Sequence, residues 1–403
     1  MARSASFDPH KLAIPGFILC ALIVAQAIPF YLLAQPAPIN PEEVYTQPIY
    51  YGKLLRTLIP LPAFILLLRS GIALRLEQRF ATHPTRWLVR GGFILAVFCL
   101  FDLFEMPYWT TYHQHNNDFG LSHIPHAEWL KNYALQKIIP YTKSLLMYLL
   151  VFCAMPLFGK RWWIGAAVLV FVLYSVLPEV LSRKIPIDLV EHVTPMEPGP
   201  HRDALEQIAQ DAARPLTLLT LDQSERSGTV TMYLTGKIGR EYLVVSDTWL
   251  EKMNPAQSAA AVAHELGHLK TRHITVPAHK VLALFFFAAA MLIVHRHYGG
   301  KAPEPAQRLH IVLAVLFAVY LGAQLKRPIA HAITRYQERT ADAYALELTK
   351  SPQAFREALL TTAEINLEPN RHPNWAYFLW SSHPSLEKRL AFCEKWSKNG
   401  INE

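Results

Sequence analysis

The chain has 403 residues, of which 52% are hydrophobic and only 17% are charged, whereas an average globular chain has about 25% charged residues. This composition excludes a disordered chain, a collagen-like chain and a solvated coiled coil, and it favours a membrane protein. The formal net charge is +8, but arginine clusters flank the apolar runs, as in membrane proteins, so we expect no nucleic-acid partner. The four cysteines form no CxxC pair and predict neither a disulfide framework nor a cysteine-bound metal.

Seven apolar runs are candidates for membrane-spanning helices, each of which needs roughly 20 mostly apolar residues. They are Leu12 to Ala34, Leu54 to Leu74, Trp87 to Pro107, Ile138 to Leu157, Trp162 to Leu181, Val281 to Val294 and Leu309 to Leu325. The first run is a retained helix in this interpretation, because no small-residue cleavage site follows it cleanly. The sixth run is short, so it either extends into a span or forms a buried hairpin. We expect a multi-pass, mainly α-helical protein in contact with the lipid bilayer.

Four regions follow from this division: five spans in 1–181, a polar segment in 182–278, two spans in 279–325 and an amphipathic helical tail in 326–403. In the polar segment, helical spacing predicts a helix over Pro200 to Ala213. Strands are expected at Pro215 to Leu221, Thr229 to Thr235 and Tyr242 to Val245, with turn residues at Gly236 to Gly239. Asn254 and Pro255 are typical of the first residues of a long helix. The tail has breaks near Pro369, Pro373 and Pro384.

The long helix contains the motif His264-Glu265-Leu266-Gly267-His268. Histidines at i and i+4 lie on one helical face, so both imidazoles can reach one zinc ion. Glu265 is then placed to take a proton from water and pass it to a leaving amine. The alternative is a solvated histidine-rich helix with no metal.

A catalytic zinc needs a third protein ligand and an open position. His273 is one candidate, but the metzincin pattern requires Gly at 271 and His at 274, where this chain has Thr271 and Ile274. Glu338 is the better candidate, because Asp342 lies one turn further along and can orient a ligating histidine. Two apolar runs separate Glu338 from the motif, so an even number of crossings returns it to the same side.

Three further polar residues deserve a chemical interpretation. By the same parity His383 is on the side of the motif, where it can hydrogen-bond a developing oxyanion, although a lone histidine in a polar turn is more often a surface residue. Asp102 and Glu105 lie at the end of an apolar run, where an acid is costly. Interfacial solvation explains the two acids without a functional role.

The chain resembles the type I CaaX prenyl proteases, integral-membrane gluzincins related to HtpX-like and Oma-like proteases. The similarity lies in the motif helix, in Arg335 to Asp342, in His383 to Leu390, in Thr194 to Glu197 and in Ser224 to Gly236. The resemblance implies that His264, His268 and Glu338 bind one Zn²⁺, that Glu265 is the base and that Asp342 supports a ligand. It further implies that Arg335 and His383 lie near the site, that Thr231, Met232 and Tyr233 belong to an edge strand that pairs with substrate, and that seven helices wall a chamber.

Two positions depart from the family pattern. His331 and Thr231-Met232 stand where the family usually has Asn and Asn-Ala, and the second change removes a side-chain amide that can hold a substrate backbone. The sequence therefore predicts a membrane-embedded zinc endopeptidase acting on prenylated or membrane-associated peptides or proteins. The alternatives are a quality-control protease of unprenylated membrane proteins and a non-catalytic membrane scaffold with a structural zinc.

Two arguments about which side of the membrane carries the motif helix disagree: the charge of the connections and the resemblance to the family. The basic residues of the short connections are Arg69, Arg75, Arg79, Arg86, Arg90, Lys160, Arg161, Arg296, Lys301 and Arg308. By the positive-inside rule these connections are cytoplasmic, and the motif helix then faces away from the cytoplasm. In the eukaryotic proteases that the chain resembles, the site opens to the cytosol. Sequence leaves the side open, in a plasma membrane of bacterial type or an ER-type membrane.

Overall fold

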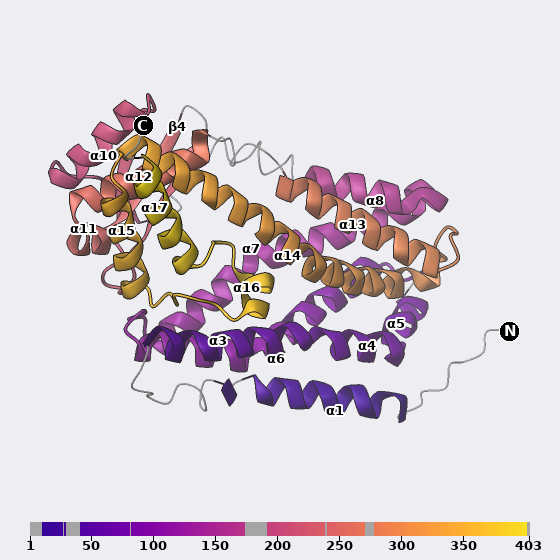
Figure 1. Cartoon of the computed structure of the whole chain (residues 1–403). Coiled ribbons are helices and arrows are strands. Elements are labelled where there is room, and N and C mark those ends of the chain that lie inside the picture. Colours follow the sequence, from indigo (N-terminus) through magenta and orange to yellow (C-terminus); the bar gives the residue numbers. More distant parts are fainter. Residues whose placement is uncertain are drawn as a thin grey trace.

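A computed structural model describes residues 10–26, 28–29, 41–80, 82–173, 192–237, 240–270 and 278–400. Most of them are helical (Figure 1). The helices are α1 (His10–Ala25), α3 (Pro41–Leu58), α4 (Pro60–Ser70), α5 (Ile72–Phe80), α6 (Arg86–Asp118), α7 (His126–Phe158), α8 (Trp162–Phe171), α10 (Pro200–Asp211), α11 (Asp247–Lys252), α12 (Pro255–Lys270), α13 (Ala278–His297), α14 (Arg308–Thr349), α15 (Pro352–Ile365), α16 (Asn374–Trp380) and α17 (Leu386–Gly400).

Five helical stretches of the described chain are long and apolar enough to cross a membrane. They are Pro41–Ser70, Arg86–Asp118, His126–Phe171, Lys280–His297 and Pro305–Thr349, with a shorter apolar helix at Gly16–Ala25. The expected fourth and fifth spans, α7 and α8, both fall in the third stretch and meet at Gly159, which has the positive φ of 52° that favours glycine. The ends of the first and fifth expected spans lie outside the described residues, so the number seven stays a prediction.

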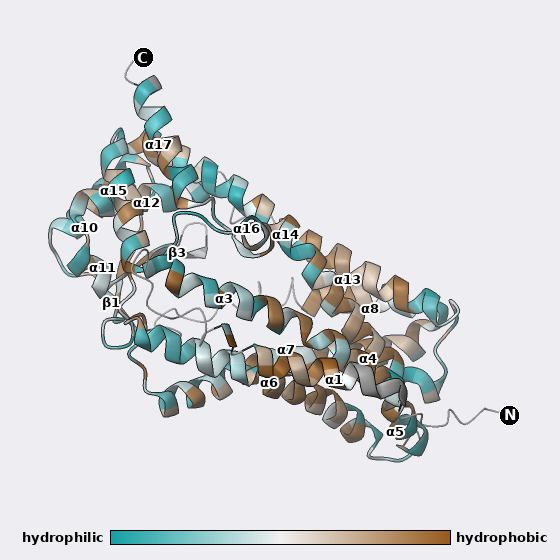
Figure 2. Ribbon diagram, turned by 60° about the horizontal axis from the view of Figure 1, so that its bottom comes forward, coloured by the Kyte–Doolittle hydropathy of each residue, from teal (hydrophilic) through white to brown (hydrophobic). Residues whose placement is uncertain are grey.

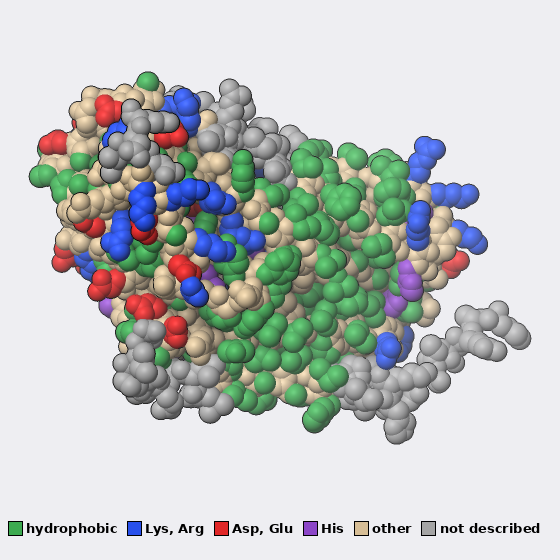
Figure 3. Space-filling model, in the orientation of Figure 1, with side chains coloured by type: hydrophobic (Ala, Val, Ile, Leu, Met, Phe, Trp, Pro, Cys, Tyr) green, Lys and Arg blue, Asp and Glu red, His purple; other side chains and the backbone are tan. Residues whose placement is uncertain are grey.

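The apolar helices together form one hydrophobic region of the molecule, which we call the helical belt. Figure 2 shows the hydrophobic residues concentrated in this half of the molecule, and Figure 3 shows a broad hydrophobic band between two ends that carry the charged side chains. The short expected run Val281 to Val294 is part of the 20-residue helix α13. It is therefore long enough to span, as the sequence allowed.

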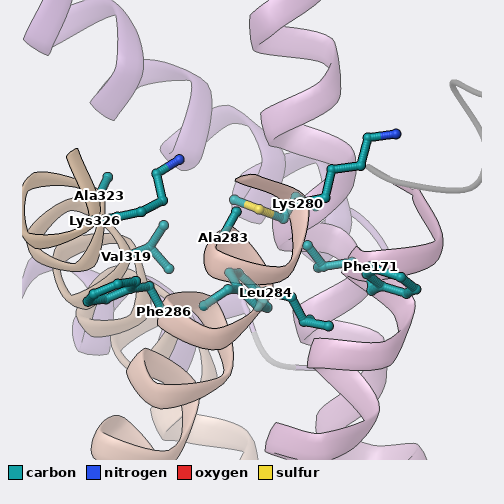
Figure 4. Close-up of a pocket in the computed structure, with 11 residues that line it drawn as sticks. Phe171, Lys280, Ala283, Leu284, Phe286, Val319, Ala323 and Lys326 are labelled. Atoms are coloured by element: carbon teal, nitrogen blue, oxygen red, sulfur yellow. The ribbon is translucent and has the colours of Figure 1, made fainter. Parts of the chain in front are cut away.

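A lateral pocket of about 390 Å³ lies between α7, α8, α13 and α14 in this belt. Apolar side chains such as Leu284, Phe286 and Phe287 line it, and the charged ends of Lys280 and Lys326 lie on one side of them (Figure 4). Its lining contains no histidine and no acid. The chemistry of the protein is therefore elsewhere.

Helix α14 runs without interruption for 42 residues, from the helical belt to the end of the molecule that carries the sheet. The expected boundary between the second pair of spans and the C-terminal tail, at 325/326, thus falls inside one helix. Glu338 is carried by the same rod as the apolar turns near Leu321. Pro328 lies inside the helix and does not end it.

A small sheet lies at the end opposite α5 (Figure 1). Its strands are β1 (Val193–Pro195), β2 (Thr217–Leu221), β3 (Met232–Lys237) and β4 (Arg240–Ser246), in the order β1-β2-β4-β3. The expected hairpin is present as β3 and β4, which pair antiparallel. However, β3 begins three residues later than the predicted Thr229, and turn residues 238–239 lie outside the described chain. Because β3 is last in the order, one of its edges has no partner strand within the described sheet.

The loop before β3 is fixed against the connection between α6 and α7. His123 N donates to Arg226 O over 3.0 Å, and Ser227 Oγ donates to Leu121 O over 2.8 Å. The two helices are longer than the spans predicted inside them, and the connection between them contacts the loop before β3. The polar half is therefore attached to the membrane half by more than the chain itself.

Candidate metal centre

Helix α12 begins where the sequence predicts. Gln257 N donates to Asn254 Oδ1 over 2.9 Å, and Asn254 N donates to Gln257 Oε1 over 2.8 Å, which is a reciprocal cap of the first turn. Further along, Gly267 lies against α14 so closely that a Cβ there would be 2.8 Å from Ala341 Cα. A glycine at this position lets the two helices approach and brings their polar side chains together.

Three potential ligands meet between α12 and α14. His264 Nε2 is 3.3 Å from Glu338 Oε2, and His268 Nε2 is 3.4 Å from Glu338 Oε1. The rings of the two histidines are perpendicular, with their centroids 4.9 Å apart. One ligand atom from each of the three residues lies within 4.8 Å of the others. This set of two imidazoles and one carboxylate is typical of catalytic zinc.

The second nitrogen of His264 is held by a carboxylate. His264 Nδ1 is 2.8 Å from Asp342 Oδ1, and Asp342 is almost completely buried. Arg389 on α17 donates to both oxygens of Asp342, over 2.6 and 2.9 Å. A carboxylate in this position fixes the ring and its tautomer so that Nε2 faces the metal position.

Glu265 lies beside these three potential ligands and forms its hydrogen bond with the sheet. Its Oε2 accepts a hydrogen bond from Leu234 N of β3 over 3.3 Å. Burial raises the pKa of Glu265 above the usual range of a glutamate, which suits a group that must accept and return a proton. Leu234 N therefore points away from β4 and toward α12.

His383 reaches the same carboxylate from the segment before α17. Its Nε2 is 3.4 Å from Glu338 Oε2, and its side chain is 59% exposed. Arg335 positions this segment, because its guanidinium donates to Ser381 O over 2.6 Å and to Tyr377 O over 3.3 Å. An exposed, anchored imidazole beside the ligands is free to contact a substrate.

The residues present fit a bound cation. Glu338 Oε2 is buried and has no hydrogen-bond partner among the described residues, which is costly for a carboxylate oxygen unless a metal uses it. Burial opposes a charge on His264, but the neighbouring carboxylates of Asp342 and Glu338 outweigh burial and raise the pKa of this imidazole to about 9. The surrounding carboxylates thus attract positive charge to this point.

A cavity of about 430 Å³ opens on the group. Of the expected substrate strand, Thr231 and Met232 line this cavity, whereas Tyr233 is not among the lining residues. Its wall also includes Glu368, whose pKa is raised by burial. The competing ligand candidate His273 lies outside the described residues.

Sequence reasoning gave no role to two residues that shape the site. Arg389 donates to Asp342. Its place in the segment His383 to Leu390, which resembles the family, was the one sequence feature that could have indicated a role. Asn366 holds the start of the edge strand, with Val230 N donating to its Oδ1 over 2.9 Å and its Nδ2 donating to Val230 O over 3.1 Å. No local pattern could assign Asn366, because its partner is 136 residues away.

The intramembrane acids are not part of the site. Asp102 is 2.9 Å from Lys137 Nζ, and Glu105 is 3.1 Å from Arg56 Nη1. Both acids have a basic partner within the helical belt, so ion pairs, and not the interfacial solvation that the sequence suggested, account for them without a catalytic role.

The model of peptidase family M48 matches residues 200–397. This part of the chain, just under half of it, is similar to that family. The matched range contains every residue of the metal centre described above, from His264 on α12 to Arg389 on α17. The chain is a metalloprotease and an integral multi-pass membrane protein.

Three relatives illustrate the similarity. An uncharacterized metalloprotease YhfN of Bacillus subtilis is 24% identical, over 82% of this chain and 80% of its own length. A CAAX prenyl protease 1 homolog of Arabidopsis thaliana is 28% identical, over 57% of this chain and 54% of its own. A protease HtpX homolog of Moorella thermoacetica is 28% identical, over 40% of this chain and 61% of its own. The chain thus aligns with only about half of the plant protein.

The fold has a counterpart of known structure. The crystal structure of S. mikatae Ste24p superposes with a TM-score of 0.68 at 19% identity, covering 95% of this chain and 99% of that one. At this identity the match concerns the fold, and it extends through the membrane half as well as the catalytic half.

Proposed function

We propose that this metalloprotease uses Zn²⁺, held by His264, His268 and Glu338, and that it hydrolyses peptide bonds within membrane-associated substrates. The buried Glu338 oxygen without a hydrogen-bond partner, facing two imidazoles, is the observation that supports this most directly. Bound zinc would lower the pKa of a water molecule and polarise a carbonyl. Metal analysis of protein purified without added metal tests the assignment: about one zinc per chain is expected, and another metal at that occupancy would refute it.

The protein's own groups supply the remaining chemistry. Glu265 accepts a proton from the attacking water and returns it to the leaving amine, since its buried carboxyl holds a proton more readily than an exposed one. His383 donates a hydrogen bond to the oxygen that becomes negative at the scissile carbonyl. Asp342 holds His264 in one orientation while these transfers take place.

An extended peptide is the substrate form that suits this site. The outer edge of β3 has no partner strand in the described sheet, and Met232 of this strand lines the cavity that contains Glu265. A peptide can add to such an edge through backbone hydrogen bonds. Leu234 N, bonded to Glu265 Oε2, shows the direction in which the edge faces.

The chemical nature of the substrate is a choice between two classes. The plant relative is named as a CAAX prenyl protease homolog, which favours prenylated peptides, whereas the second class is unprenylated membrane proteins. Mass spectrometry of the products from matched prenylated and unprenylated peptides distinguishes them. Cleavage of only the prenylated member supports the first class, and equal cleavage supports the second.

A non-catalytic scaffold with a structural zinc is the alternative outside enzymes. A structural site closes all four positions with protein ligands, whereas the described group offers three, with Glu265 and His383 placed beside it. The absence of any hydrolysis in the peptide panel, with zinc bound, would favour the scaffold.

We infer further that the metal centre faces away from the cytoplasm. The basic connections near α5 and between α13 and α14 lie at the end opposite the sheet (Figure 1), and α5 contacts the turn Pro305–Gln307. By the positive-inside rule this end is cytoplasmic. Cysteines at exposed Glu225 and exposed Lys301, in a background without the native cysteines, test it: an impermeant maleimide on intact cells should label position 225 and not 301.

A further inference from the structure

A second pocket, of about 560 Å³, lies behind the metal centre between α14, α16 and α17. Its lining combines aromatic side chains, such as Tyr336 and Tyr377, with five basic residues and a single carboxylate, Asp342. The basic residues are Arg335, Arg339, Lys388, Arg389 and Lys395. This pocket is separate from the cavity that holds Glu265, although Pro384 and Arg389 line both.

Most of this positive charge is not neutralised by the protein. Arg389 is paired with Asp342, and Arg335 donates to two backbone carbonyls. No ion pair of the described residues includes Arg339, Lys388 or Lys395. A pocket with several unpaired basic side chains, whose single carboxylate is already paired with an arginine, attracts an anion.

The pocket lies at the boundary between the hydrophobic band and the charged end that carries the sheet. Figure 3 shows lysine and arginine side chains gathered over α14 and α17, where the hydrophobic band meets the catalytic end. Tyr336 is 69% exposed and Phe378 is 57% exposed beside it. Exposed aromatic side chains at such a boundary are typical of the headgroup region of a membrane.

We propose that this pocket binds the phosphate of an anionic phospholipid headgroup. Lysine and arginine side chains give a phosphate charged hydrogen bonds, and the adjoining aromatic and apolar surface continues toward the acyl region. A zwitterionic headgroup carries a compensating ammonium and loses most of this attraction. Free inorganic phosphate has the same anionic chemistry, so the experiment must separate the two sources.

Native mass spectrometry of the full-length protein, released from mixed phosphatidylglycerol and phosphatidylcholine vesicles, tests the proposal. The wild type should retain phosphatidylglycerol in preference to phosphatidylcholine. The double substitution Lys388→Gln with Lys395→Gln should weaken this preference roughly fivefold for each lysine, the size expected of one basic residue near an anionic surface. The charge-conserving pair Lys388→Arg with Lys395→Arg should restore it, which excludes misfolding as the cause.

Two matched variants locate the effect. Lys398→Gln changes a lysine of α17 that is paired with Glu394 over 2.8 Å and lies outside the pocket, so it should retain the preference. Lys280→Gln with Lys326→Gln changes the lysines of the lateral pocket in Figure 4. Loss of the preference in that pair, and not in the α17 pair, would overturn the assignment.

Competition with inorganic phosphate distinguishes a lipid headgroup from a free phosphate as the ligand. Inorganic phosphate at millimolar concentration should compete only weakly with phosphatidylglycerol, because it gains nothing from the neighbouring apolar surface. Binding of phosphate to the wild type but not to the Lys388 and Lys395 variant, together with no preference between the two lipids, would make the ligand a free anion and refute the headgroup.

Discussion

The membrane half and the metal centre both bury charged side chains, but they balance them differently. In the helical belt, three buried or half-buried acids each have a basic partner. The pairs are Glu77 with Arg90, Asp102 with Lys137 and Glu105 with Arg56. Such pairs add no chemistry, because each charge already has its counterion.

At the metal centre the buried acidic side chains outnumber the arginines that pair with them. Glu265, Glu338 and Asp342 lie close together, and the arginine among them, Arg389, donates to both oxygens of Asp342. Since unpaired buried carboxylates are costly, the remaining negative charge attracts a cation, either a proton on His264, whose pKa it raises, or a metal ion. The comparison teaches that a local surplus of buried charge, and not buried charge itself, distinguishes the functional region.

The largest effect is expected from removal of the proposed third ligand, Glu338. Glu338→Ala should lose the metal and all measurable peptidase activity, since two imidazoles remain without a carboxylate. His273→Ala should keep both. Metal content and activity of the two purified variants check this, and the opposite pattern would identify His273 as the ligand.

The substitution Glu265→Gln separates the metal from the chemistry. It should keep the metal, because Glu265 is beside the ligands and is not one of them, and it should lower the hydrolysis rate by about 10²–10⁴, as loss of a positioned acid–base group does. Hydrolysis at the wild-type rate would contradict the proposed role.

In the membrane half, the corresponding experiment is Glu77→Gln. It leaves Arg90 buried beside a neutral partner, where Arg90 Nε now donates to Glu77 Oε2 over 3.0 Å. Breaking a buried pair costs about 3–5 kcal/mol, so thermal unfolding in detergent should occur at a markedly lower temperature, with the metal content unchanged. Glu387→Gln, in an exposed pair with Arg371, is the control and should unfold like the wild type.

The smallest effect is expected from Asp342→Ala. This residue orients His264 and does not bind the metal, so metal affinity or activity should fall by about 10–100-fold, as is usual for such a partner. A loss as complete as that of Glu338→Ala, measured under the same conditions, would show that Asp342 is itself a ligand.

The sequence was most informative where the pattern is local. The i, i+4 spacing placed His264 and His268 on one face, and Asn254 predicted the start of α12, because both signals lie within one or two helical turns. Glu338 needed a parity argument across two apolar runs. Arg389 and Asn366 could not be assigned roles, since their partners are far away in sequence and only the packing of α12, α14 and β3 brings them together. The β3 boundary shifted because Thr229 and Val230 bond to side chains outside the sheet, and Thr231 contacts β4 only through Ser246.

The continuity of α14 makes the peptidase inseparable from its anchor. A helix of 42 residues is about 60 Å long. One end of α14 lies in the hydrophobic belt, and the other end carries Glu338 of the proposed metal centre. Any cut between Leu321 and Glu338 would sever the third ligand from the helix that orients it. Proteolytic shedding therefore cannot release an active soluble fragment, and the enzyme works only where its membrane is.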